Sequence, residues 1–168
     1  MRLFGPWEVR FRGRGTFSGV AAAKKHWITP RGKLLTVITR TLIVAYRATG
    51  GLVGARMRGL PGILLTTTGA RSGQPRVVHL PYIPDGDDMI VVASFAGGPR
   101  NPAWFHNLVA HPVVTVQYQR DVFEADAQRI AGDALAPAWA LVAEAGPWYV
   151  GYQDQTDRDI PLVRLRRR

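Results

Sequence analysis

The sequence predicts a mainly β fold of the α+β class, a small barrel of six antiparallel strands with a few flanking helices. Strand-like segments follow one another after Gly62, and turn residues separate them. Several connections are short, which favours antiparallel pairing. Closure into a barrel also removes exposed sheet edges. A chain of 168 residues is long enough for one such domain with a hydrophobic core.

Each expected strand is bounded by residues that favour turns. Gly69 and Gly73 lie in the first turn, and a Pro-Asp-Gly-Asp tetrad at 84–87 forms a later one. The six strands are placed at 63–68, 76–83, 88–94, 113–119, 122–130 and 160–165.

A helix is expected at 33–49, before the strands. Its apolar residues recur at three- and four-residue steps and include Ile38, Leu42 and Tyr46, whereas Arg40 leaves this stripe. The helix could pack on the core or lie on a membrane beside its basic neighbours.

Two further helices interrupt the strands. One is expected at 101–110, where Asn101 would be the N-cap and Pro102 the first helical residue. The other is expected at 133–145, with Pro137 near its first turn.

The excess positive charge belongs to the first third of the chain. Residues 1–60 contain 12 Lys or Arg and one acid, whereas residues 61–168 are almost neutral. We therefore expect a basic arm at 1–32 and a barrel domain at 33–168. Because the arm alternates cations with aromatic residues, it could contact an anionic membrane surface or stack on single-stranded nucleic acid.

Several classes of function are excluded by residues that the sequence lacks. Without cysteine there is no disulfide, thiolate metal site or cysteine nucleophile. No secretory signal is visible at the N-terminus, and the apolar segment 34–48 is too short and too charged to cross a bilayer. No grouping of His, Asp and Glu has metal-ligand spacing, so no metal is expected.

Two stretches combine glycine with hydrogen-bond donors. In the first, ILLTTTGARSGQPR at 63–76, glycine-rich backbone and two arginines suit a phosphate, although an ordinary hairpin turn is the alternative. In the second, VVASFAGGPRNPAWFHNL at 91–108, a strand passes through glycines into a helix N-terminus. Farther on, Tyr149 and Tyr152 would share one helical face, either covering an aromatic ligand or packing in the core.

The chain resembles the deazaflavin-dependent nitroreductase family of actinobacteria over about 44–165. The resemblance rests on LLTTTGARSGQPRVVHLPY, VVASFAGGPRNPAWFHNLVAHP and YQDQTDRDIPLV in this order, and on YRATGG at 46–51. It implies a split β-barrel that binds reduced coenzyme F420. It also implies transfer of a hydride from the deazaflavin to a quinone, a nitro compound or an activated alkene.

The resemblance also implies the site residues. Arg71, Ser72 and Arg76 would hold the coenzyme phosphate and the start of its glutamyl tail, with Thr68 beside them. The deazaflavin ring would be lined through the backbone by Ser94, Phe95, Ala96, Gly97 and Gly98. Trp104, His106 and Asn107 would support this pocket, and Tyr149, Tyr152 or Ser94 would stabilise or protonate the acceptor.

Some features depart from the family pattern or leave alternatives open. Ala70 and Phe95 stand where a basic residue is frequent, which puts the affinity for the coenzyme tail in doubt. The alternatives are an FMN-dependent oxidoreductase and a non-catalytic F420 or lipid carrier. We expect a cytoplasmic protein, with attachment to the inner face of the plasma membrane left open. It would be a monomer or homodimer that does not bind nucleic acid.

Overall fold

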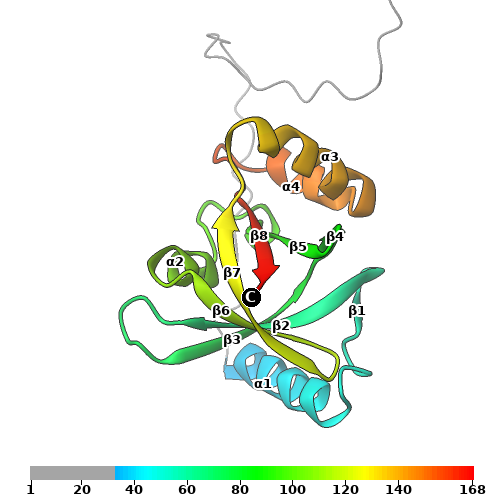
Figure 1. Cartoon of the computed structure of the whole chain (residues 1–168), viewed down its shortest axis with the longest axis vertical. Helices are drawn as coiled ribbons and strands as arrows, with labels where there is room; N and C mark the ends of the chain where they lie inside the picture. The colour runs from blue at the N-terminus through cyan, green and yellow to red at the C-terminus, as the bar shows by residue number, and fades with distance from the viewer. Residues whose placement is uncertain (1–32) are drawn as a thin grey trace, which may run out of the picture.

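A computed structural model describes residues 33–168, and side chains from residue 37 onward. It shows a curled antiparallel sheet with helices packed around it (Figure 1). The expected basic arm at 1–32 lies outside the described residues, so the division into arm and barrel stays a prediction. None of the described helices is long and apolar enough to span a bilayer.

The described part of the chain contains eight strand segments. They are β1 (Arg56–Met57), β2 (Leu60–Thr68), β3 (Pro75–Pro81), β4 (Ile83–Asp85), β5 (Asp88–Val92), β6 (Val113–Tyr118), β7 (Asp121–Arg129) and β8 (Leu162–Arg167). Four α-helices and two 3₁₀ turns accompany them. These are α1 (Lys33–Ala48), η1 (Phe95–Gly97), α2 (Ala103–Ala110), η2 (Gly132–Ala134), α3 (Leu135–Ala145) and α4 (Trp148–Asp154).

One bent strand takes part in both ends of the sheet. The antiparallel order of the sheet is β3-β2-β6-β7-β8-β5-β4, so β3 and β4 lie at opposite ends. Only Tyr82 separates them along the chain, and its N–H donates to the carbonyl of Pro61 at 3.0 Å. The expected strand 76–83 is therefore one strand bent at Tyr82. With β3 and β4 counted together, the six expected strands are all present and β1 is the addition; the mainly β, split-barrel class is confirmed.

Several expected boundaries were wrong by a few residues. The strand expected at 88–94 ends at Val92, because the chain turns into η1. The last strand runs Leu162–Arg167 instead of 160–165, because its terminal arginines pair with acids on neighbouring strands; Arg167 and Asp121 are 2.6 Å apart. Asn101 is not the N-cap of α2: Pro102 takes that position, and the Asn101 side chain accepts a hydrogen bond from Arg158.

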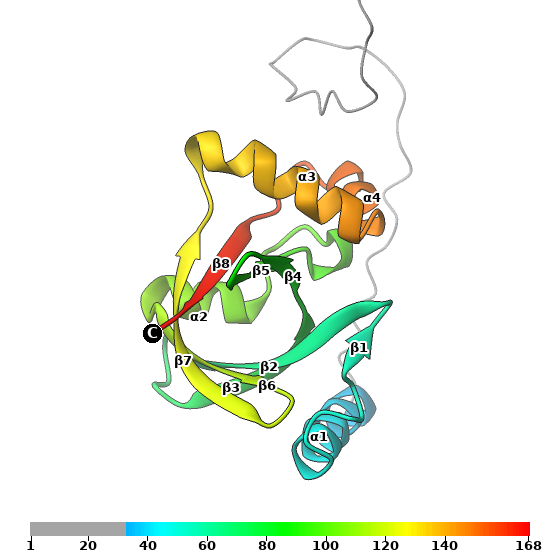
Figure 2. The ribbon, with the colours of Figure 1, turned by 45° about the vertical axis from the view of Figure 1, so that its right-hand side comes forward.

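Two apolar clusters lie on the two faces of the sheet. Val91 belongs to the barrel interior, where α2 adds Trp104, Phe105 and Leu108. Its strand neighbour Ile90 points to the other face, under α3 and α4, because successive side chains alternate in a strand. Figure 2 shows α3 and α4 together over the β4, β5 and β8 region. The continuous apolar run in β5 thus reflects burial on both faces.

Tyr46 fastens α1 to the barrel. Its side chain is fully buried, and its hydroxyl donates to the carbonyl of Gly62 at 3.0 Å while accepting from the N–H of Gln119 at 2.8 Å. The rest of the apolar stripe behaves differently, since Ile38 and Leu42 remain exposed. α1 therefore packs on the core through its last turns.

We expect His79 to make stability depend on pH. Its ring lies 5.4 Å from that of Tyr46, and its Nε2 lies 2.9 Å from the carbonyl oxygen of Gly54. Burial lowers the pKa of His79 below its usual 6.5. The unfolded chain therefore takes up this proton at a higher pH than the folded protein, so stability is retained above pH 6.5 and falls as the pH drops below it.

Denaturant unfolding of the wild type and of His79→Gln between pH 8 and pH 5 measures this effect. The variant should lose the part of the decline that begins below pH 6.5. Equal pH dependence of the two proteins would contradict the assignment.

Candidate functional site

The turn between β2 and β3 and the first residues of β3 present two arginines to solvent. The N–H of Gly69 donates to the carbonyl of Gln74 at 2.9 Å, and the N–H of Gly73 donates to the carbonyl of Gly69 at 2.8 Å. Gly73 has a φ of +64°, which glycine adopts without strain. Arg71 and Arg76 are exposed and form no ion pair within the described part of the chain. Both guanidinium groups can therefore bind an external anion.

Asn107 connects this turn to α2. Its Nδ2 donates to Thr67 Oγ1 at 3.0 Å, and its Oδ1 accepts from the N–H of Ala70 at 3.0 Å. Thr67, near the end of β2, is only 1% exposed, so the strand side of this link is buried in the protein. The arginine-bearing turn thus lies against the helix that follows the second glycine stretch. Thr68 is half-buried beside them, and Ser72 is exposed.

The second glycine stretch has an unusual backbone. Phe95, Ala96 and Gly97 have φ values of +47°, +50° and +77°, and the first two lack the freedom of glycine. Ser94 is buried, whereas Phe95 and Ala96 are exposed. Gly97 faces α4: a Cβ added there would lie 3.1 Å from the carbonyl oxygen of Tyr152. The loop therefore lies between the barrel and α4.

Arg158, to which sequence reasoning assigned no role, holds this loop. Its guanidinium donates to the carbonyls of Ser94 and Gly98 and to Asn101 Oδ1, at 2.7, 2.9 and 2.6 Å. A fourth bond, at 3.1 Å, reaches the carbonyl of Ala93. The signal was present in the YQDQTDR segment. It was hidden because an arginine between two aspartates usually indicates a solvated surface cluster.

The two tyrosines of α4 share a face, as expected, but differ in exposure. Their ring centroids are 6.1 Å apart. Tyr149 is 4% exposed, and burial raises its pKa to about 12. Tyr152 is half-buried, and its hydroxyl accepts from Arg58 Nη1 at 3.0 Å. Arg58, which the sequence reading also missed, lies over the Trp148 ring at 5.6 Å.

The remaining residues expected on α2 divide between core and surface. Trp104 is buried in the barrel interior, so it can support the site only from beneath. His106 is exposed, with its ring 6.0 Å from that of Phe105. Among the described residues, no group of three or more His, Asp or Glu is arranged to hold a metal.

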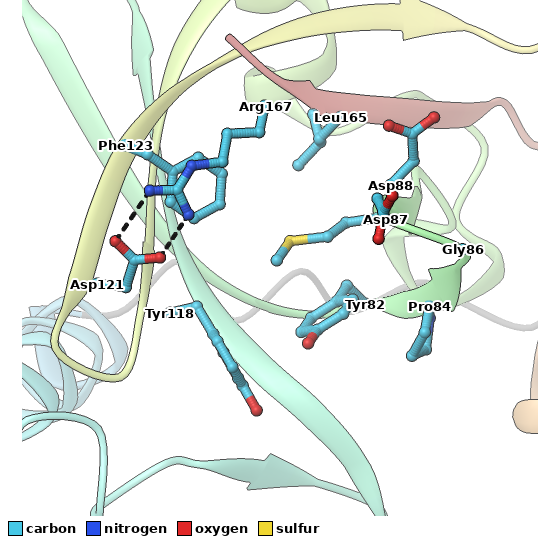
Figure 3. A pocket seen from close by; sticks show the side chains of 11 residues that line it. Tyr82, Pro84, Gly86, Asp87, Asp88, Tyr118, Asp121, Phe123, Leu165 and Arg167 are labelled. Atoms are coloured by element: carbon cyan, nitrogen blue, oxygen red, sulfur yellow. Dashed lines mark hydrogen bonds and ion pairs between the residues drawn. The ribbon is translucent and has the colours of Figure 1, made fainter.

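A cavity of about 280 Å³ lies elsewhere, on the β4, β5, β6, β7 and β8 side of the barrel (Figure 3). Its wall includes Tyr82 and Tyr118, whose rings meet edge to face at 5.7 Å, and Arg167, which lies 4.3 Å over the Phe123 ring. Burial raises the pKa of Tyr82 to about 12. No residue expected at the coenzyme site lines this cavity.

The turn thus lies against α2 through Asn107, and the 94–98 loop lies against α4 at Gly97. The turn supplies guanidinium groups, and the backbone N–H groups of Arg71 and Ser72 have no partner among the described residues. The 94–98 loop contributes a buried serine and a tightly packed glycine, and α4 contributes the Tyr152 hydroxyl. This donor set suits a ligand with an anionic tail and a planar polar ring, as F420 requires.

Comparison with known proteins identifies the family. The model of the F420H(2)-dependent quinone reductase family matches residues 38–166. The chain belongs to this family. An F420H(2)-dependent quinone reductase of Mycobacterium tuberculosis is 42% identical over 127 residues, which cover 73% of this chain and 85% of the relative.

This member of the F420H(2)-dependent quinone reductase family is also similar in fold to solved structures. A structure of an F420H2-dependent reductase, FDR-A, is 39% identical with a TM-score of 0.58, and covers 62% of this chain and 93% of that one. A structure described as a domain-swapped dimer is 36% identical with a TM-score of 0.61, and covers 75% of this chain and 92% of that one. The expected family resemblance, the oxidoreductase class and coenzyme F420 are confirmed.

Proposed function

We propose that the protein transfers a hydride from reduced coenzyme F420 to a quinone. The observation that carries this proposal is the link through Asn107, which places the arginine-bearing turn against α2 at 3.0 Å. The cations of the turn then lie beside the helix that follows the 94–98 loop in the chain. Related proteins named F420H(2)-dependent quinone reductases support the choice of acceptor.

The residues of this candidate site have separable tasks. Arg71 and Arg76 bind the phosphate and the anionic tail, because planar guanidinium groups match their oxygens. The backbone at 94–98 orients the ring, for which reduced F420 supplies the hydride once bound. Positioning and charge stabilisation are then the main contributions of the protein. Nitro compounds and activated alkenes remain further candidate acceptors at the same site.

Tyr152 is the group best placed to serve the acceptor. Its hydroxyl already accepts a hydrogen bond from Arg58, so its own proton is free to be donated to a developing negative charge on the acceptor oxygen. Tyr149 lies beneath it and packs against its ring, and Ser94 could act through a water molecule.

Tyr152→Phe should lower kcat for quinone reduction by about 10²-fold, which is typical of losing a general acid or oxyanion donor. Tyr149→Phe is the matched control, because Tyr149 is 4% exposed and should change kcat far less. Stopped-flow oxidation of F420H2 by a menaquinone analogue measures both. Equal rates in the wild type and Tyr152→Phe, with coenzyme affinity intact, would remove Tyr152 from the mechanism.

The enzyme itself is tested by binding and turnover. Absorbance titration with F420, FMN and haem should show saturable binding of F420 in preference to the other two. Reduced F420 should then be oxidised when the menaquinone analogue is added. Binding without turnover by any quinone, nitro or alkene acceptor would favour a carrier, and preferential FMN binding would favour an FMN-dependent oxidoreductase.

A second candidate function, attachment to an anionic membrane, is favoured by the outer face of α1. Val37 and Val44 are 57% and 65% exposed, and Ile38 and Leu42 are also exposed on the same helix. The following turn adds Leu52. Arg40 and Arg47 are exposed beside these apolar side chains. Interfacial helices combine apolar and basic residues in this way.

We expect the protein to sediment with anionic phospholipid vesicles at low salt and to be released by high salt. Val37→Glu combined with Val44→Glu should weaken this association about tenfold or more, because both side chains would enter the interface. Val109→Glu, on the exposed face of α2, is the control. Absence of sedimentation with anionic vesicles at low salt would refute the proposal.

A further inference from the structure

The loop that follows β5 cannot hold its shape by local preference alone. Three successive residues, Phe95, Ala96 and Gly97, have positive φ values, and two of them have side chains that disfavour this region. The bonds inside the loop are few: the N–H groups of Gly97 and Gly98 donate to the carbonyls of Ser94 and Phe95, both at 3.0 Å. Contacts from outside the loop must therefore select this conformation.

Arg158 supplies such contacts, and all of its acceptors belong to this loop or its exit. Its four bonds span residues 93–101, and none of the acceptors is a carboxylate. Asp157 and Asp159, its neighbours in sequence, are exposed and form no ion pair with it. The guanidinium is therefore used to orient backbone groups, for which its planar set of donors is suited.

Arg158 is itself held in place from α4. Gln153 Nε2 donates to the carbonyl of Arg158 at 2.8 Å, and Gln153 Oε1 accepts from the N–H of Ile160 at 2.8 Å. The amide of Gln153 thus fixes the backbone on both sides of residue 159. α4 also packs on the loop at Gly97. The loop is consequently held between Arg158 on one side and α4 on another.

The direction of these bonds decides which way the N–H groups at the start of the loop point. The described chain contains no cis peptide bond, and in a trans peptide the C=O of one residue and the N–H of the next point in opposite directions. Arg158 binds the carbonyls of Ala93 and Ser94. The N–H groups of Ser94 and Phe95 therefore point away from the guanidinium.

We propose that Arg158 is a positioning residue for the coenzyme site: by holding the carbonyls of Ala93 and Ser94, it turns the N–H group of Ser94 toward the bound deazaflavin ring. This inference rests on the proposed function for the identity of the ligand. The four hydrogen bonds of Arg158 form in the protein without coenzyme. Arg158 touches neither hydride nor acceptor, and it acts through the loop.

Arg158→Lys tests the proposal, because it keeps the charge but cannot replace four divergent bonds. Arg164→Lys is the matched control, since Arg164 is a half-buried arginine of β8 that pairs with Asp85 and Asp88, away from the loop. The first measurement is amide hydrogen exchange of peptides covering 93–101 in the protein without coenzyme. The second is the Kd for F420, and the third is the KM for the quinone.

In Arg158→Lys we expect exchange at 93–101 to accelerate and the Kd for F420 to rise, each by about tenfold or more, with the KM for the quinone little changed. Arg164→Lys should alter none of the three. Unchanged loop exchange and unchanged Kd in folded Arg158→Lys would overturn the proposal. If that variant does not fold, Asn101→Ala, which removes one of the four acceptors, should show the same effects at smaller size, and their absence would again overturn it.

The outcomes also separate the two proposals. Faster loop exchange in Arg158→Lys, together with wild-type protein that binds no F420, would refute the proposed function and would overturn the assignment of the loop to the coenzyme. Tight F420 binding by both wild type and Arg158→Lys would leave the proposed function standing and overturn the role of Arg158.

Discussion

Replacing Tyr46 with alanine should lower the free energy of unfolding by about 4 kcal/mol, because a fully buried aromatic side chain and its hydrogen bonds are lost together. The hydroxyl bonds Gly62 of β2 and Gln119 of the β6–β7 turn, while the ring lies against His79 of β3. One side chain of α1 therefore joins three parts of the barrel. The N–H of Gln119 would lose its acceptor in the variant.

Chemical denaturation of the wild type, Tyr46→Phe and Tyr46→Ala measures this effect and separates its parts. Tyr46→Phe removes only the hydroxyl and should cost about 1–3 kcal/mol. Tyr118→Phe, which removes a hydroxyl from a half-buried tyrosine, is the control and should cost less. A loss below about 1.5 kcal/mol in Tyr46→Ala would mean that α1 is not fastened by this residue.

Removing the charges of Arg71 and Arg76 together should raise the Kd for F420 by about 100-fold, or about 1.4 kcal/mol for each arginine. Both guanidinium groups are free of ion pairs in the described chain; Arg71 lies in the turn that Asn107 ties to α2, and Arg76 lies at the start of β3 beside it. Arg71→Gln combined with Arg76→Gln keeps polar side chains of similar length. Fluorescence titration with F420 at two salt concentrations measures the change.

The double variant should also lose most of the salt dependence of coenzyme binding, because that dependence arises from charge pairing. Arg40→Gln combined with Arg129→Gln lowers the net charge equally at exposed positions on α1 and β7 and should leave the Kd nearly unchanged. If the two double variants weakened binding equally, overall charge rather than the turn would hold the coenzyme.

The sequence was sufficient to predict the mainly β barrel and the three expected helices. Regular turn signals and apolar periodicity determine these features locally. The bend at Tyr82 was not predicted, because a strand that leaves one end of a sheet and joins the other end looks continuous in sequence. The two-residue β1 has too few residues to form a pattern.

Contacts between side chains that are far apart in sequence were the hardest features to predict from the sequence. Arg158 reaches Ala93 across 65 residues, and Arg58 reaches Tyr152 across 94. Neither pairing leaves a spacing that local reasoning can detect. The burial of Tyr149 was one of two stated alternatives, and its 4% exposure reflects α3 and the outer face of the sheet closing over it.

The bent strand at Tyr82 has a mechanical consequence for the whole barrel. Its two halves, β3 and β4, lie at opposite ends of the sheet. One end of the sheet therefore cannot separate from the barrel without displacing the other. The amides of β2 and β5 should accordingly lose their protection from hydrogen exchange at the same denaturant concentration, because the two strands unfold as one cooperative unit and not by fraying from either end of the sheet.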